Sequence, residues 1–270
     1  MSSDTPLVCA VMLMNGRLEM VKRAIRSYRS QTYERKNLLI LDSGRDPLVD
    51  VLDLERGEFY ALAHPPLMGG VPIGALRNFA NAMIPSADVI VHWDSDDWSA
   101  PLRIEHQLVS LRASPFGCVG YNSMLFWREP PTQPWETVHC LCGKSYPCSG
   151  APCSGCGRYP MGEAWMYRNG NPRYALGSSL CYVRRHWETS NFWNDLPCSP
   201  DSASEYAHWM GHLTGVQGWI GNVPALIATI HGGNTSSAYR RELMVANEAQ
   251  GGEWRRSPDD DAVCVEALKL

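Results

Sequence analysis

The chain has 270 residues, 44% of them hydrophobic and 19% charged, which is an ordinary composition for a globular protein with one large or two small α/β domains. Its formal net charge of -4 excludes a general attraction to nucleic acid or to anionic membranes. Because no basic leader and no apolar run near the ~20 residues of a membrane span is visible, we expect a cytoplasmic enzyme.

The first 112 residues alternate apolar runs with amphipathic segments. Strands are expected at Leu7–Met14, Asn37–Leu41, Glu58–Leu62 and Val89–Trp93. Helices are expected at Arg17–Ser30, at Ile73–Met83, and from an N-cap at Ser99 to about Arg112. This alternation predicts a doubly wound α/β sheet flanked by helices, with its ligand at the carboxyl ends of the strands.

The second half is less regular. Strands are expected at Val119–Trp127, Ser179–Val183 and Val223–Ile230, and a helix at Ala203–Leu213. Residues 128–172 are rich in Pro, Gly, Cys and Trp and are expected to form an irregular insert. We expect one domain over residues 1–250 and a mobile or peripheral tail over residues 251–270.

An acidic cluster, Asp94-Ser95-Asp96-Asp97, directly follows the strand expected at Val89–Trp93. Residues two apart on an extended chain point the same way, so Asp94 and Asp96 can face one site. Two carboxylates held this close repel each other unless a cation lies between them, and Mg²⁺ or Mn²⁺ prefers such oxygen ligands. The alternative is a solvated acidic turn that caps the next helix.

Further short motifs stand at the ends of the expected elements. They are Val11–Arg17 with Ala24–Tyr33, Leu39–Gly44, Gly74–Ala80, Asp94–Asp97, Ser204–Trp209 and His231–Ser236. In this order they resemble the "NR" and "QTY", "IVDDGS", "ARN", "DxDD", "ED" and "HGxNTS" segments of family 2 glycosyltransferases with the GT-A fold. The resemblance implies a nucleotide-sugar-binding half over residues 1–112 and an acceptor half over residues 113–250. It also implies an inverting transfer of a sugar from a nucleoside diphosphate, most often UDP, to an acceptor hydroxyl.

The resemblance also implies roles for individual residues. The metal ligands would be Asp94 and Asp96, with His231 as a third ligand or as a donor to the diphosphate. Asn15 and Arg17 would line the base pocket, Asp42 would accept from the base or ribose, and Arg77 and Ser95 would contact the donor. Asp42 can equally form a turn with Ser43 and Gly44.

The general base is expected on the acceptor side. An inverting transfer needs a carboxylate there to take the hydroxyl proton while the diphosphate leaves from the opposite face. Glu205 fills this role in the resemblance, with Asp201 in reserve. The sequence departs from the family here, because Ser204-Glu205 stands in place of its "ED" pair.

Five of the ten cysteines crowd into the insert. The pairs Cys140 with Cys142 and Cys153 with Cys156 have the close spacing of a structural zinc site, with Cys148 or His139 as possible substitutes. Disulfides and free cysteines are the open alternatives.

Two other functions stay open at this point. A nucleotidyltransferase shares the sheet and the acidic metal site, although the single glycine after the first strand does not form a phosphate loop. A nucleotide-sugar-binding module without turnover is the other. The acceptor could be a glycan, a protein, a lipid-linked sugar or a modified nucleic-acid base.

Overall fold

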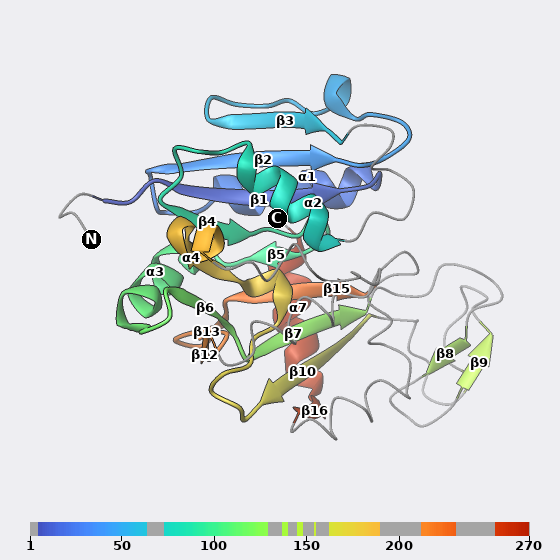
Figure 1. The fold of residues 1–270 in the computed structure, drawn as a ribbon. Helices are drawn as coiled ribbons and strands as arrows, with labels where there is room; N and C mark the ends of the chain where they lie inside the picture. The colour runs from blue at the N-terminus through green and yellow to red at the C-terminus, as the bar shows by residue number, and fades with distance from the viewer. Residues whose placement is uncertain are drawn as a thin grey trace.

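The structure is a computed structural model that describes residues 5–63, 73–128, 137–139, 145–147, 154, 162–189, 212–230 and 252–269. These residues form a larger and a smaller sheet; the blue strands of the larger sheet lie at the top of Figure 1, and most of the smaller sheet lies in its lower half. They also form two short strand pairs and two 3-10 turns. These are β8 (Thr137–His139) with β9 (Ser145–Pro147), β13 (Trp219–Ile220) with β14 (Val223–Pro224), η1 (Val49–Val51) and η3 (Gly177–Ser179).

The larger sheet has seven strands in the order β12-β6-β11-β4-β1-β2-β3. They are β1 (Val8–Met14), β2 (Lys36–Asp42), β3 (Glu58–Leu62), β4 (Val89–His92), β6 (Cys118–Tyr121), β11 (Cys181–Val183) and β12 (Thr214–Val216). Strands β4, β1, β2 and β3 are parallel neighbours, whereas β11 runs antiparallel to β4 and β6. The parallel part therefore brings the carboxyl ends of β1, β2 and β4 to one edge of the sheet.

Helices cover both faces of the larger sheet. Helices α1 (Leu18–Arg29) and α3 (Arg103–Ala113) pack on the face that includes Met12 of β1. Helices α2 (Ile73–Ala82) and α4 (Arg184–Thr189) pack on the opposite face, which includes Val11. Strand β1 is apolar throughout because both of its faces are covered. The predicted doubly wound α/β sheet flanked by helices is confirmed.

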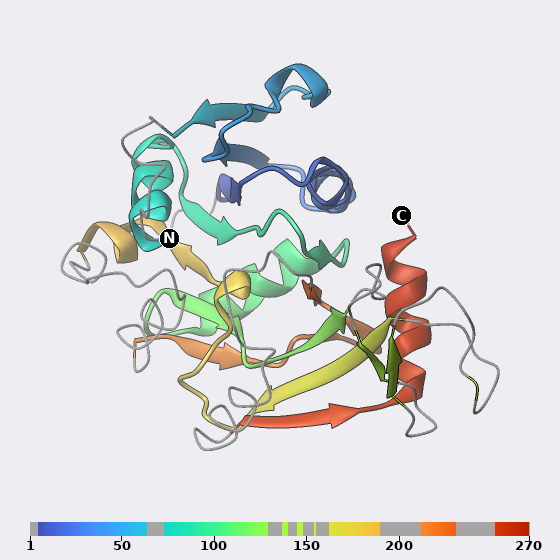
Figure 2. The same ribbon diagram turned by 90° about the vertical axis from the view of Figure 1, so that its right-hand side faces the viewer.

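The smaller sheet has five strands in the order β16-β10-β7-β15-β5. They are β5 (Trp98–Ser99), β7 (Ser123–Arg128), β10 (Glu163–Asn169), β15 (Leu226–Ile230) and β16 (Gly252–Arg256). Helix α7 (Pro258–Leu268) packs on this sheet, where Cys264 is buried in one cluster with Trp127 and Ala164. Figure 2 shows the smaller sheet and α7 on the side of the molecule away from β3.

Two predicted strands differ in the structure. The run Val119–Trp127 is not one strand, because β6 ends at Tyr121 in the larger sheet and β7 begins at Ser123 in the smaller one. The two strands are buried, so apolar residues stand on both sides of the polar pair Asn122-Ser123 at the change of sheet. The run Val223–Ile230 likewise divides into β14 and β15.

Three further predictions were wrong. Ser99 is not an N-cap, because it pairs with Leu226 in β5 and α3 begins only at Arg103. The insert is not irregular over residues 163–169, which form β10 between β7 and β16. The last residues are not a peripheral tail: β16 pairs with β10 and α7 contributes the fully buried Cys264.

The predicted helix at Ala203–Leu213 lies outside the described residues, apart from its last two positions. Within the described ranges, none of the helices combines the length and the apolar character needed to cross a membrane.

Candidate functional site

The acidic cluster lies at the end of β4, beside the carboxyl ends of β1 and β2. Pairing continues one residue beyond β4, where the Trp93 N–H donates to the Val11 carbonyl at 2.9 Å. The Trp93 indole N–H also donates to the Ala24 carbonyl of α1 at 3.1 Å. The chain then turns, and the Asp97 N–H points back to the Asp94 carbonyl at 3.4 Å. This turn presents the three aspartates of the acidic cluster to one space.

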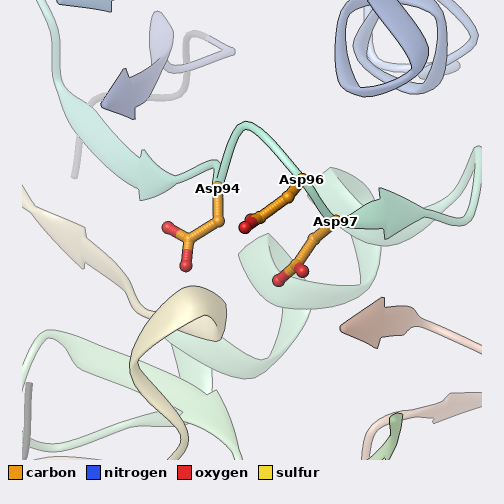
Figure 3. A group of neighbouring side chains, drawn as sticks. All are labelled: Asp94, Asp96 and Asp97. Atoms are coloured by element: carbon orange, nitrogen blue, oxygen red, sulfur yellow. The ribbon is translucent and has the colours of Figure 1, made fainter. Parts of the chain in front are cut away.

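Figure 3 shows the side chains of Asp94, Asp96 and Asp97 converging. One ligand oxygen from each lies within 4.8 Å of the other two, and no other such group of three occurs among the residues that the structure describes. Asp94 and Asp96 were predicted as metal ligands. Asp97 was not predicted as a metal ligand, although its position in Asp94-Ser95-Asp96-Asp97 could have indicated it.

The electrostatics of the cluster favour a cation. Burial raises the pKa of the Asp97 carboxyl well above its ordinary value, and the charges of Asp96 and Asp94 raise it further. Burial also raises the pKa of Asp94, while Arg77 acts in the opposite direction and Asp96 adds to the increase. Three crowded carboxylates fit a hard divalent ion with oxygen ligands.

Two predicted donor-binding arginines contact this cluster. Arg77 of α2 is 4% exposed, and its Nη2 donates to Asp94 Oδ1 at 3.2 Å. Arg17 Nη1 lies 3.6 Å from Asp96 Oδ2. Arg17 has φ 61° and ψ 53°, and Gly16 before it has φ 70°, so a left-handed turn starts α1 beside the cluster. A non-glycine residue in this region is uncommon and often lies at a functional site.

Asp42, the last residue of β2, is fully buried. Its Oδ1 accepts the Gly44 N–H at 2.7 Å, and its Oδ2 accepts the Leu48 N–H at 3.2 Å and the Tyr60 hydroxyl. These bonds make the turn with Gly44 that was one alternative for this residue. A contact to a base or ribose stays a prediction.

The remaining donor-binding candidates lie at the same edge of the sheet. Asn15 is exposed just after β1, and Ser95 is 5% exposed between two aspartates of the cluster. Their contacts to a donor stay predictions.

The other predicted site residues lie outside the described residues. They are the base candidates Glu205 and Asp201, the third ligand His231, and the zinc candidates Cys140, Cys142, Cys153 and Cys156. Their roles stay predictions.

Comparison with known proteins shows similarity in structure alone. No family model matches the chain, and no curated protein matches it in sequence. The structure is similar to S. aureus TarS 1-349 with a TM-score of 0.50 and 11% identity, over 82% of this chain and 60% of that one. TarS 1-349 in complex with UDP gives a TM-score of 0.50 at 11% identity, over 83% and 60%. The complex with UDP-GlcNAc gives 0.51 at 11% identity, over 90% and 65%.

The chain thus spans less than two thirds of these TarS chains. At 11% identity the likeness establishes the fold alone. The predicted GT-A-like architecture is confirmed: this chain has the fold of a glycosyltransferase, with an acidic cluster at the carboxyl ends of its parallel strands.

Proposed function

We propose that this chain is a metal-dependent, inverting glycosyltransferase of the family 2 type. It transfers a sugar from a nucleoside diphosphate donor, with UDP as the favoured nucleotide, to an acceptor hydroxyl. The convergence of three carboxylates within 4.8 Å at the ligand-binding edge of a glycosyltransferase fold carries the proposal. The similar TarS structures include complexes with UDP and with UDP-GlcNAc, which favours a nucleotide sugar here.

Asp94 and Asp96 would hold Mn²⁺ or Mg²⁺, with Asp97 beside them and His231 as the further candidate from the sequence. When bound, the ion supplies positive charge against the diphosphate that departs with the nucleoside. Arg77 and Arg17 would orient the diphosphate, because a guanidinium donates paired hydrogen bonds to phosphate oxygens. Asn15 and Asp42 would bind the base or ribose at the ends of β1 and β2, and Ser95 would contact the donor.

On the acceptor side, Glu205 would take the proton from the attacking hydroxyl, with Asp201 as the alternative base. We expect Glu205→Gln to retain donor binding and to lose transfer. An active Glu205→Gln enzyme would assign the base to Asp201 instead. Within the insert, Cys140, Cys142, Cys153 and Cys156 would hold a structural zinc ion, and metal analysis of the purified protein tests this directly.

The experiment that tests the function measures donor turnover. The purified chain is incubated with UDP-GlcNAc or UDP-glucose, with Mn²⁺ or with EDTA, and released UDP and pyrophosphate are quantified. We expect release of UDP that needs Mn²⁺ and is lost in Asp96→Asn. Asp50→Asn, an exposed aspartate in η1, is the matched control and should retain turnover.

The other outcomes select the alternatives. Release of pyrophosphate would identify a nucleotidyltransferase. Stabilisation by UDP and Mn²⁺ without any turnover would identify a binding module. If no nucleotide sugar is turned over and none stabilises the chain, the proposal is refuted.

A further inference from the structure

Three distant parts of the chain meet behind the acidic cluster. From α1, Arg23 Nη2 donates to the Asp96 backbone carbonyl at 3.0 Å and to Thr229 Oγ1 at 2.9 Å. From β15, the Thr229 N–H donates to Asp97 Oδ1 at 3.0 Å. Thr229 is fully buried and Asp97 is 5% exposed. These hydrogen bonds connect the acidic cluster to a helix of the larger sheet and a strand of the smaller sheet.

The bond from Arg23 goes to the peptide carbonyl of Asp96 and leaves the carboxylate of that residue for the site. The carboxylate of Asp96 instead faces Arg17. Arg23 therefore holds the backbone at Asp96 in place and does not occupy the carboxylate oxygens that could bind a cation. This separates it from Arg17 and Arg77, which contact the carboxylates themselves.

The position of β15 makes this connection rigid. Ile227 of β15 pairs with Trp98 of β5, directly after the acidic cluster, and also with Leu125 of β7. The cluster is thus held by β4 on one side and by β5 and β15 on the other. A shift of the Asp96 peptide would break its hydrogen bond from Arg23.

We infer that Arg23 and Thr229 are positioning residues, which set the spacing of the three carboxylates for a divalent cation. The inference rests on the proposed function, because it assigns a purpose to residues around the proposed metal site. Groups that orient the ligands of a metal typically change its affinity 10–100-fold when they are removed. Neither residue touches the cation or the donor directly in this scheme.

The test measures Mn²⁺ affinity of the full chain by electron paramagnetic resonance titration without any nucleotide sugar. Arg23→Met should weaken Mn²⁺ binding about 10-fold or more. Arg26→Met, an exposed arginine one turn along α1, should leave it unchanged. Thr229→Val removes the hydroxyl and keeps the N–H to Asp97, so it should weaken binding as well. Thr229→Ser keeps the hydroxyl and should restore wild-type affinity.

The measured Mn²⁺ affinities distinguish a failure of this inference from a failure of the proposed function. If the wild type binds Mn²⁺ and both Arg23→Met and Thr229→Val bind it equally well, the positioning role is overturned and the proposed function stands. If the wild type binds no Mn²⁺, both are overturned. Should Arg23→Met fail to fold, the comparison of Thr229→Val with Thr229→Ser decides, because only the serine retains a γ-hydroxyl that can accept from Arg23.

Discussion

Arg103 carries a guanidinium that is fully buried beneath the acidic cluster. Its Nη1 donates to Ser99 Oγ, and its Nη2 donates to the carbonyls of His92 and Ser178, each at 2.8 Å. Burial lowers the pKa of Arg103, while charges that include Asp97 act to raise it. These hydrogen bonds offset part of the cost of burying the charge, and the nearby negative charges of Asp97 and Asp94 offset a further part.

We therefore predict that Arg103→Met strongly destabilises the fold. The methionine fills much of the volume but leaves the buried carboxylates without this counter-charge. Leaving the carbonyls of His92 and Ser178 without their donor, and the buried Asp97 without a nearby positive charge, should lower the free energy of unfolding by about 3–5 kcal/mol. If that reasoning holds, Asp97→Asn should be less destabilising, or even stabilising, in the Arg103→Met background, with a coupling of about 0.5–3 kcal/mol.

The assay is urea unfolding at pH 7.5 in EDTA, for the wild type, both single variants and the double variant. Arg112→Met is the control, because it removes an exposed arginine from the same helix and should change stability by less than about 0.5 kcal/mol. A loss below about 1 kcal/mol for Arg103→Met, or strictly additive effects of the two changes, would refute the reasoning.

Three further predictions concern the frame around the site. Burial acts to raise the pKa of Glu58, but hydrogen bonds from Arg29 hold this pKa below its ordinary value. The ionised Glu58 therefore stabilises the fold above about pH 4.3, and this effect is lost at lower pH. In urea unfolding, Glu58→Gln should be destabilising at pH 7 and much less so at pH 3. Burial lowers the pKa of His92 well below its ordinary value, so the unfolded chain binds a proton that the folded chain does not. Stability should therefore fall below about pH 6.5, by at most ~1.4 kcal/mol per pH unit, and an equally steep fall in His92→Gln would contradict this. The Cβ of Gly218→Ala would overlap a backbone carbonyl oxygen of β7, so we expect a loss of about 1–3 kcal/mol in thermal unfolding, whereas Gly170→Ala, with open space around it, should lose less.

The sequence predicted the first half of the fold well because its signals are local. Apolar runs buried on both faces mark β1 and β2, and helical spacing marks α1 and α2. The change of sheet at Asn122 left only the polar pair Asn122-Ser123 as a signal, because the segments beyond it on both sides are apolar and buried. The pairing of β16 with β10 was equally hidden, since it joins segments about ninety positions apart.

The same contrast applies to the site. Arg17, Arg77, Asp94 and Asp96 were predicted together because their motifs resemble those of one family's donor site, and the structure brings them into contact at the edge where the parallel strands end. Arg23 and Thr229 were not predicted, because their contacts join residues that are 206 positions apart in the chain. Neither the periodicity of the sequence nor a motif indicates that these two residues meet.

Among the residues that the structure describes, four arginines lie around the acidic cluster, and their contacts divide them into two pairs. Arg17 and Arg77 contact carboxylates, whereas Arg23 and Arg103 donate to the backbone carbonyls of Asp96 and His92. Under the proposed function, a cation on the carboxylates would compete with the first pair, and a diphosphate would offer that pair new oxygens. The second pair can keep its bonds throughout, because a backbone carbonyl changes neither charge nor partner when the site fills. The chain can therefore exchange the contacts of its carboxylates while the loop that carries them stays in place.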